Sequence, residues 1–214
     1  MSYFPFFVDV KDKAFLVVGG GGVALRKIEV LSRFDVKIIV IAADICKEIY
    51  DWKEISGRQD GENGQIELHE RKFKDEDILK AEYVVAATDN EKLNTHISEL
   101  CRKNSKPVNV VDVKEECSFV FPAIIKEEDL VIAVSTGGNS PAMAAKIKRD
   151  IERNIPLYYS ELIGLLGAYR EAVKNEITLP ENRRKAYREL IRMAERKEDS
   201  LSEASVMDII RKYR

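Results

Sequence analysis

A run of four glycines, Gly19 to Gly22, has the composition of a turn that binds phosphate groups. An apolar run at residues 14–18 precedes it, and apolar residues at helical spacing follow it. The pattern Gly19-x-Gly21-x-x-Ala24 fits the G-x-G-x-x-G/A fingerprint of dinucleotide-binding folds, in which a strand leads through the glycines into a helix. The free N–H groups at the start of that helix bind the pyrophosphate. We therefore predict a nucleotide site here; the alternative is a plain tight turn.

Each residue of the fingerprint has its own expected task. Gly19 supplies the tight turn, Gly21 lets the backbone approach the pyrophosphate, and Ala24 lets the helix pack close to the strand. In such proteins an acidic residue farther along binds the ribose hydroxyls of NAD, and Asp44 lies 23 residues after Gly21. No arginine follows directly to hold a 2′-phosphate, so the sequence favours NAD over NADP. Asp44 could equally cap a helix that begins near Ile45.

Polar residues that follow other apolar runs extend this candidate site. Thr88 and Asp89 follow the run at residues 83–87, and Asp112 follows the run at residues 107–111. A carboxylate at Asp112 could act as a general base beside a nicotinamide ring. Because aspartates at strand ends are also common turn caps, the residues alone leave the function of Asp112 open.

Histidine and cysteine give little sign of other chemistry. His69 and His96 have no partner at metal-ligand spacing, so we expect both to be structural or exposed, and we expect no resident metal. Cys46, Cys101 and Cys117 are odd in number and far apart, which indicates neither a disulfide framework nor a Cys-x-x-Cys metal site.

The elements that must position this candidate site alternate between strand and helix. Strands are predicted at residues 14–18, 36–41, 66–73, 83–87 and 107–111. Helical segments are predicted at residues 45–55, 75–80 and 91–103, and a surface loop at residues 56–64. This alternation predicts an α/β fold with a parallel, Rossmann-like sheet, whose ligands bind beyond the carboxyl ends of the strands. Four groups of residues fall at those ends: Gly19–Val23, Ala43–Asp44, Thr88–Asp89 and Asp112.

The first residues, and those after residue 117, depart from this pattern. Residues 4–10 are apolar but broken by Pro5, and we expect an edge strand or an extended arm there.

Two apolar runs, residues 118–125 and 130–134, are joined by a charged turn, which predicts a β-hairpin. A hairpin alone is only marginally stable, so we expect this one to pack on another surface, such as a second subunit.

A loop of small residues follows the hairpin at residues 135–140. Its N–H groups could cradle a carboxylate or a phosphate. In the simpler alternative, Ser140 only caps the helix that Pro141 begins. Residues 141–214 have the pattern of three or four helices, separated at Pro156, at residues 178–180 and at residues 197–202. We expect this part to be helical core and solvated surface without chemistry.

Composition limits the partners that we expect. The 214 residues are 45% hydrophobic and 34% charged, as is typical of a globular protein. A net charge of −2 gives no reason to expect a nucleic acid or an anionic membrane as partner. The sequence begins without the pattern of a secretory signal, and no run is long enough to cross a bilayer. We therefore expect a cytoplasmic protein.

Six sequence blocks resemble the precorrin-2 dehydrogenase/sirohydrochlorin ferrochelatase family. That family forms the N-terminal module of siroheme synthase and also occurs as a free-standing enzyme, which is the form expected here. The blocks follow family order and family spacing. They are PFFVDVKD from Pro5, VVGGGGVALRK from Val17, AATDN from Ala86, VNVVD from Val108, FVFPAII from Phe119 and VSTGGNSPA from Val134.

The resemblance implies a reaction and an assembly. Family members remove two hydrogens from precorrin-2 with NAD as cofactor, giving sirohydrochlorin, and some also insert Fe²⁺ as a chelation substrate. They are homodimers, in which the tetrapyrrole lies between the dimerisation ribbon, the helical tail and the cofactor. The implied domains are an NAD-binding Rossmann-like domain at residues 1–113, a dimerisation ribbon with the substrate loop at residues 114–145, and a helical domain at residues 146–214.

The resemblance also implies residue assignments. Gly22 and Val23 match the pair that contacts the pyrophosphate, and Ala43 and Asp44 match the adenosine-side contacts. Asp112 matches the aspartate thought to act as base in both reactions, and we place Asn109 beside it as a substrate contact. A loop near the tetrapyrrole carboxylates matches Ser135, Thr136, Gly137, Gly138 and Ser140.

Two departures from the family pattern and three other interpretations accompany this assignment; one of the three is a purely structural dimer with a decayed site, against which the intact residues Gly19–Ala24 and Asp112 argue. Members often carry Asp, Glu or another side chain at the position of Gly22, and some bifunctional members carry a serine at the position of Thr136. A dedicated dehydrogenase without chelatase activity would have the same sequence features. A non-catalytic Rossmann module that senses NAD would bind the cofactor without turnover and would need neither the hairpin nor the small-residue loop.

Overall fold

The computed structural model describes residues 3–56 and 66–214, which form two compact units. The first unit comprises Met1–Phe121 and Gly137–Asn139, and the second comprises Pro122–Thr136 and Ser140–Arg214. The surface loop expected at residues 56–64 lies outside the described residues except for Ser56, which ends a helix. The three-part division expected at residues 113 and 145 stays a prediction.

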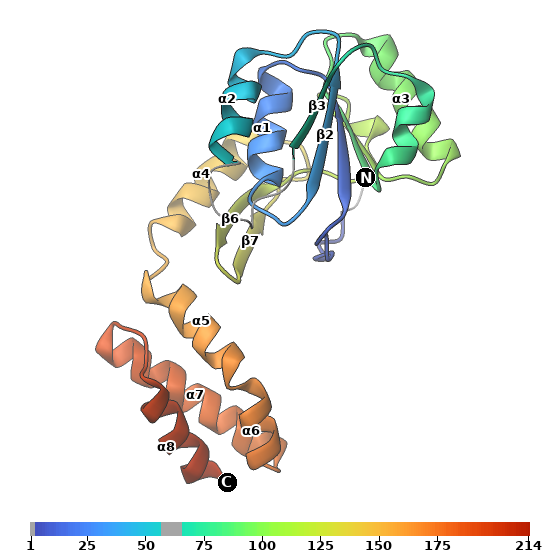
Figure 1. The fold of residues 1–214 in the computed structure, drawn as a ribbon. Coiled ribbons are helices and arrows are strands. Elements are labelled where there is room, and N and C mark those ends of the chain that lie inside the picture. Colours follow the sequence, from blue (N-terminus) through green and yellow to red (C-terminus); the bar gives the residue numbers. More distant parts are fainter. Residues whose placement is uncertain (1–2, 57–65) are drawn as a thin grey trace. The chain divides into compact units, whose positions relative to one another are not determined.

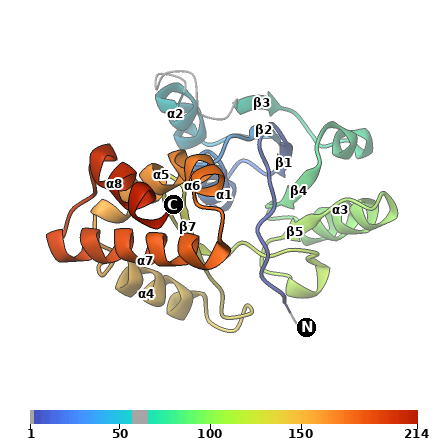
Figure 2. The ribbon, with the colours of Figure 1, turned by 90° about the horizontal axis from the view of Figure 1, so that it is seen from below.

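A five-stranded parallel sheet forms the centre of the first unit (Figure 1). Its strands are β1 (Ala14–Val18), β2 (Lys37–Ala42), β3 (Ile66–Glu70), β4 (Tyr83–Ala86) and β5 (Val108–Val110). They lie in the order β3-β2-β1-β4-β5, which can be followed in Figure 2. The expected α/β Rossmann-like fold is therefore confirmed. β1 has its predicted bounds, whereas β3 ends at Glu70 and not at residue 73.

Helices cover both faces of this sheet because its strands are apolar on both sides. The helices between the strands are α1 (Gly22–Leu31), α2 (Lys47–Ser56), α3 (Glu91–Lys103) and the short 3₁₀ helix η1 (Asp75–Lys80). α1 and α2 lie on one face of the sheet and α3 on the other (Figure 1). Ile28 of α1 packs in a cluster with Val17, whereas Ile97 of α3 packs in a cluster with Leu16, because successive strand residues face opposite layers.

The N-terminal segment is an extended arm and not an edge strand. Residues 4–10 form no strand, and Pro5 has no N–H to donate to a neighbouring strand. Phe4, Phe6 and Phe7 expose 82%, 72% and 75% of their surface. Three exposed phenylalanines on one short segment form an apolar surface of the kind that marks an interaction site.

The hairpin expected after residue 117 belongs to the second unit. Its two strands are β6 (Ala123–Glu127) and β7 (Leu130–Val134). The helix α4 (Pro141–Glu152) packs on both strands. The strands are antiparallel, with Ile125 opposite Ile132, and Ile125 is buried. β6 begins five residues later than expected because Ser118 and Phe119 are hydrogen-bonded to residues of β5 in the first unit.

Residues 141–214 are all described and hold five helices, where three or four were expected. After α4 these are α5 (Tyr158–Ala168), α6 (Arg170–Glu176), α7 (Pro180–Lys197) and α8 (Glu203–Tyr213). The expected breaks at Pro156, at residues 178–180 and at residues 197–202 are confirmed. The additional break lies at Tyr169, between α5 and α6.

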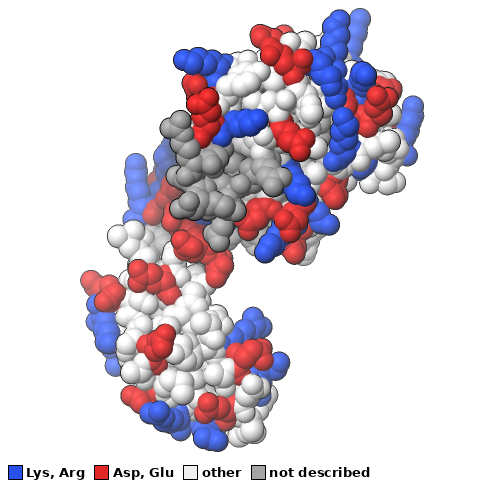
Figure 3. All heavy atoms as spheres, in the orientation of Figure 1, with Lys and Arg blue, Asp and Glu red and all other residues white. Residues whose placement is uncertain are grey.

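The last four helices share a core of buried apolar side chains. Leu162, Val173, Leu190 and Ile210 are each at most 5% exposed. α7 and α8 lie side by side in Figures 1 and 2. On the face drawn in Figure 3, Lys and Arg side chains are interspersed with Asp and Glu. Among the described residues, no helix combines the length and the apolar character needed to cross a membrane.

Candidate dinucleotide-binding site

The carboxyl ends of β1 and β4 meet where the sheet changes its direction of growth. From β1 the chain adds β2 and β3 on one side and then crosses over to add β4 and β5 on the other. Open α/β sheets bind ligands at such a topological switch point. The N–H of Ala87 donates a hydrogen bond of 2.8 Å to the carbonyl of Val18, which joins the two strand ends directly.

At two of the four glycine positions, neighbouring backbone atoms leave no room for a side chain. Gly19 has φ +129°, and a Cβ there would lie 2.2 Å from the carbonyl oxygen of Ala87. A Cβ on Gly20 would lie 2.2 Å from the carbonyl oxygen of Asp44. Gly19 therefore makes the tight turn between the strand ends. Sequence reasoning missed Gly20, because the fingerprint leaves that position free.

The other two glycines face open space. A Cβ on Gly21 or Gly22 would meet nothing within 4 Å. Gly21 is the N-cap residue of α1; within this described first turn no side chain caps the helix and no acidic residue occurs. The N–H groups of the turn, that of Val23 among them, are therefore available to an anion, which the helix dipole also favours. This arrangement fits the pyrophosphate of a dinucleotide.

Ala43 and Asp44 are exposed at the carboxyl end of β2. α2 begins at Lys47, so the residue at its N-cap position is Cys46, which argues against the alternative that Asp44 is the cap. The N–H of Cys46 donates a hydrogen bond of 2.9 Å to the carbonyl of Gly20 and keeps the end of β2 beside the glycine turn. Asp44 therefore lies exposed beside the glycine turn, and its contact with ribose hydroxyls stays a prediction.

The turn after β4 is held by Asn94 of α3. The hydroxyl of Thr88 donates to Oδ1 of Asn94 at 2.7 Å, and the side-chain nitrogen of Asn94 donates to the carbonyl of Thr88 at 2.9 Å. Asn94 is only 5% exposed, whereas Asp89 is exposed at the tip of the turn. Asn90 caps α3 by accepting a hydrogen bond from the N–H of Leu93. Sequence reasoning missed Asn94, for which a polar residue at a buried helix position was the available signal.

Asp112 lies in a turn closed by the sulfur of Cys117. Asp112 is exposed and has φ +62°, a conformation that aspartate tolerates better than most residues. The one S–H of Cys117 lies within reach of two carbonyl oxygens, that of Val110 (3.1 Å) and that of Val113 (3.3 Å), on either side of Asp112. Burial raises the pKa of this thiol and so keeps it a hydrogen-bond donor. The short 3₁₀ helix η2 (Lys114–Glu116) completes the turn.

Asn109, predicted as a substrate contact, lies in the interior. It is 6% exposed, and its side-chain amide donates a hydrogen bond of 3.0 Å to the carbonyl of Phe119. Ser118 is anchored beside it, since its N–H donates to the carbonyl of Val108 at 2.8 Å. Asn109 therefore holds the segment after the Asp112 turn against β5, and its contact with substrate stays a prediction.

Lys27 brings a cation from α1 to the same region. Its ammonium lies 4.2 Å from the centroid of the Phe121 ring, close enough for a cation–π interaction. Burial and, less strongly, Arg26 lower the pKa of Lys27, while Cys117 and Asp112 act in the opposite direction. Sequence reasoning missed this residue, which appeared only as a basic position one turn into α1.

The small-residue loop at residues 135–140 is closed by its own hydrogen bonds. The hydroxyl of Thr136 donates to the carbonyl of Ser140 at 2.9 Å and accepts from its N–H at 3.1 Å. The Ser140 side chain caps α4, and Pro141 is the first residue of that helix, as predicted. Gly137 and Gly138 have φ of +62° and +84°, which glycine adopts most readily. The cap is confirmed; contact between this loop and a ligand stays a prediction.

The first unit thus gathers most of the predicted residues at one edge of its sheet. Those residues are Gly19, Gly21, Gly22, Val23, Ala43, Asp44, Thr88, Asp89 and Asp112. Among the residues that the structure describes, no group of three or more His, Cys, Asp or Glu side chains could hold a metal ion. His96 contacts Asp75 at 2.8 Å and His69 contacts Glu67 at 3.5 Å.

Two protein-family models match most of the chain. Residues 6–123 match the family model described as putative NAD(P)-binding, and residues 128–154 match the model described as sirohaem biosynthesis protein central. A solved structure described as SirC, precorrin-2 dehydrogenase, has a TM-score of 0.76 and 23% sequence identity, with 99% of this chain and 98% of that chain covered. At this identity, the likeness concerns the fold.

Curated relatives are similar over nearly the whole chain. The siroheme synthase of Thioalkalivibrio sulfidiphilus is 41% identical over 191 residues, which is 89% of this chain and 37% of the relative. The siroheme synthase of Ruthia magnifica is 37% identical over 184 residues, which is 86% of this chain and 37% of the relative. The chain therefore spans little more than a third of the length of these relatives.

Proposed function

Because this chain belongs to the putative NAD(P)-binding family and its relatives are siroheme synthases, we propose that it oxidises precorrin-2 to sirohydrochlorin with NAD. The family resemblance inferred from the sequence blocks is confirmed. The observation that carries the proposed activity is the open first turn of α1 at the switch point, on the same edge of the sheet as the carboxylate of Asp112.

The proposed reaction takes one hydride and one proton from precorrin-2, so that the products are sirohydrochlorin, NADH and a proton. NAD supplies the hydride acceptor when it is bound. Asp112 accepts the proton from a ring nitrogen or a meso carbon. The Cys117 thiol holds the turn that presents this carboxylate, and Asn109 holds the segment behind it.

The residues that would hold the cofactor follow from their positions. The N–H groups of Gly22 and Val23 would bind the pyrophosphate at the start of α1. Ala43 and Asp44 would contact the adenosine side, with the Asp44 carboxylate accepting from the ribose hydroxyls. That carboxylate would repel a 2′-phosphate, which supports NAD over NADP. Thr88 and Asp89 would line the site from the end of β4.

The tetrapyrrole would be recognised through its carboxylates. The loop of Ser135, Thr136, Gly137, Gly138 and Ser140 has a conformation that its own hydrogen bonds fix, and the Ser140 hydroxyl, which accepts from the N–H of Met143, can still donate its proton to a carboxylate. We also propose that the protein inserts a metal ion into sirohydrochlorin. Fe²⁺ would enter as a substrate and be bound by the tetrapyrrole nitrogens, and Asp112 would again remove protons.

Two features support a homodimer as the working assembly. The arm exposes Phe4, Phe6 and Phe7, and a partner subunit would remove these three rings from water. The β6–β7 hairpin is only two strands wide and gains stability from any further surface that covers it. Cys46, Cys101 and Cys117 are free thiols, which suits the reducing cytoplasm in which we place the reaction.

The test is an anaerobic assay that mixes the purified protein with freshly generated precorrin-2 and NAD. We expect the visible spectrum to change to that of sirohydrochlorin as NADH forms in equal amount. Asp112→Asn should abolish turnover and leave NAD binding intact. Asp12→Asn is the matched control, because Asp12 is also exposed with φ +60° but precedes β1, at the opposite edge of the sheet.

Three outcomes would correct the proposal. NAD binding without any spectral change would favour the non-catalytic sensor. Near-normal turnover by the Asp112→Asn variant would exclude this aspartate as the base. Sirohydrochlorin that stays metal-free when Fe²⁺ or Co²⁺ is added to the same cuvette would restrict the protein to dehydrogenation.

A further inference from the structure

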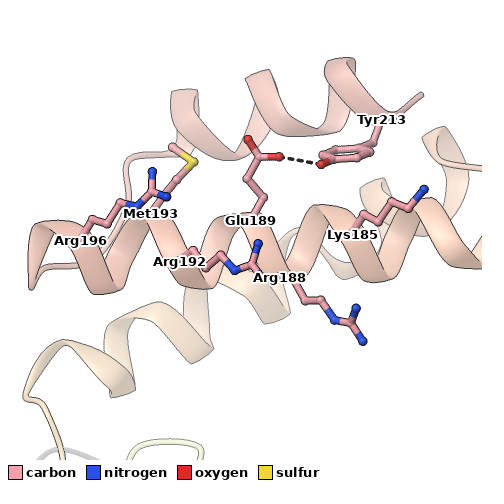
Figure 4. A pocket seen from close by; sticks show the side chains of 7 residues that line it. All are labelled: Lys185, Arg188, Glu189, Arg192, Met193, Arg196 and Tyr213. Atoms are coloured by element: carbon pink, nitrogen blue, oxygen red, sulfur yellow. Dashed lines mark hydrogen bonds between the residues drawn. The ribbon is translucent and has the colours of Figure 1, made fainter.

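A pocket of about 310 Å³ lies in the second unit, beside α7 and α8 (Figure 4). Four basic side chains of α7 line it: Lys185, Arg188, Arg192 and Arg196. Met193 of α7 and Tyr213 of α8 add apolar and aromatic surface. No residue that we assigned to the dinucleotide site takes part in this pocket.

The four cations form one stripe along α7. Their spacing of three or four residues keeps them on one side of the helix, and the stripe from Lys185 to Arg196 is about 16 Å long. The whole of α7 carries seven Lys and Arg against three Asp and Glu. Among the described residues, none of the ion pairs uses any of the four. The stripe is therefore a concentrated positive charge and not a balanced surface.

Glu189, the acidic residue that lines the pocket, does not neutralise this charge. It lies four residues after Lys185 and three before Arg192, positions from which a helix side chain could pair with either. Its carboxylate is instead directed to α8 (Figure 4), where it accepts from Nζ of Lys212 at 2.7 and 2.8 Å and from the Tyr213 hydroxyl at 2.7 Å. Both oxygens are engaged, and the cations of α7 are left for an external anion.

We propose that this pocket binds carboxylates on the rim of the tetrapyrrole, an inference that rests on the proposed function. Precorrin-2 combines an apolar macrocycle with carboxylates spread around its edge. An extended row of cations matches such a rim better than a single site would, and arginine pairs with carboxylates through two parallel hydrogen bonds. Met193 and Tyr213 give the macrocycle an apolar surface beside the cations.

Porphyrin titrations test this assignment. The probe is uroporphyrin, a stable octacarboxylate, followed by its fluorescence, with the tetracarboxylate coproporphyrin for comparison. The Arg188→Gln/Arg192→Gln variant should bind uroporphyrin about tenfold more weakly than the wild type, because it loses charge-assisted hydrogen bonds from two arginines to the carboxylates. The matched control is Arg184→Gln/Lys197→Gln, which removes two exposed charges of α7 outside the pocket. The wild type should prefer uroporphyrin to coproporphyrin and lose affinity with added salt.

The outcomes separate this inference from the proposed function. Equal uroporphyrin affinity in the pocket variant and the control variant would overturn the inference, even where the wild type oxidises precorrin-2. Loss of uroporphyrin affinity in the pocket variant alone would support it, even if precorrin-2 were never turned over. If the pocket variant loses affinity for a single-stranded RNA and keeps it for uroporphyrin, the surface binds phosphates and the carboxylate assignment is wrong.

Discussion

The sulfur of Cys117 accepts a hydrogen bond of 3.2 Å from the N–H of Val110 and so ties the segment after η2 to the last residue of β5. The same thiol donates to the carbonyl of Val113. Asp112 lies between these two attachment points with φ +62°. The left-handed conformation of the proposed base is thus held from both ends by one side chain.

Removing this sulfur should disturb catalysis more than binding. We expect Cys117→Ala to lower kcat for dehydrogenation by about ten- to a hundredfold, because a small displacement of a catalytic group is costly. KM for NAD should not change, and Cys117→Ser should recover most of the activity because a hydroxyl can make the same contacts. Cys101→Ala, in the core, should lower stability without this loss of kcat. Wild-type kcat in the Cys117→Ala enzyme would show that the turn holds without the thiol.

The glycine turn predicts opposite effects for two neighbouring substitutions. Gly20→Ala would place a Cβ 2.2 Å from the Asp44 carbonyl oxygen and 2.9 Å from Cβ of Ala42, so the free energy of unfolding should fall by about 1–3 kcal/mol. Gly21→Ala would place its methyl in open space at φ −96°, which alanine allows. It should keep wild-type stability and lose NAD affinity, since the methyl group occupies the space assigned to the pyrophosphate.

Urea unfolding and NAD titration measure the two effects separately. Equal loss of stability in Gly20→Ala and Gly21→Ala would contradict the packing of Gly20 against Asp44. Unchanged NAD affinity in Gly21→Ala would contradict the pyrophosphate position.

Asp77 should make the stability of the first unit depend on acid pH. It is 1% exposed, and the guanidinium of Arg71 donates to both of its oxygens at 2.7 and 2.8 Å. The hydrogen bonds from Arg71 hold the pKa of Asp77 far below its usual range, against the opposing effect of burial. A depressed pKa means that the carboxylate stabilises the fold above its ordinary pKa of about 3.9, and that this stabilisation is lost as pH falls below that value.

We expect Asp77→Asn to lower the free energy of unfolding by about 3 kcal/mol at neutral pH, since it leaves Arg71 without its partner. The difference from wild type should shrink below pH 4. Glu76→Gln, an exposed neighbour, is the control and should change little. Urea unfolding over a pH series gives the measurement, and a difference that does not vary with pH would count against this assignment.

The exposed arm makes a prediction about assembly. Phe4→Ser/Phe6→Ser/Phe7→Ser should shift the protein from dimer towards monomer, because the rings that we assign to the partner interface are lost. Sedimentation equilibrium provides the measurement. Ile55→Ser/Leu79→Ser is the control, since both residues are exposed and belong to separate elements of the first unit. If the wild type is a monomer, or if the variant dimerises like the wild type, the assignment of the arm to a dimer interface is wrong.

Local sequence signals were sufficient where one segment determines its own structure. β1 has its predicted bounds because a continuous apolar run ends at a glycine. α3 begins and ends as predicted because Asn90 supplies a cap and the apolar spacing is regular. The glycine fingerprint likewise located the strand–turn–helix unit, since each part of it lies within a few residues.

Residues that act through distant partners could not be predicted in this way. Gly20 is constrained by Asp44, and Thr88 is held by Asn94, both through contacts formed only in the folded sheet. The apolar residues at 118–122 look like a strand, but Ser118 and Phe119 are bound to β5 and the strand starts later. The break between α5 and α6 carries no proline, so the sequence pattern is helical through Tyr169 and does not indicate a break there.

The central position of β1 has a consequence for the order of events during synthesis. A nascent chain that ends with α2 can pair β1 with β2 only, and the other edge of β1 stays open until β4 emerges. The site needs Ala87 and Thr88 beside Gly19, so it cannot exist before residue 88 has left the ribosome. A cofactor present in the cell can therefore stabilise this unit only late in its folding, after the first half of the sheet has formed without it.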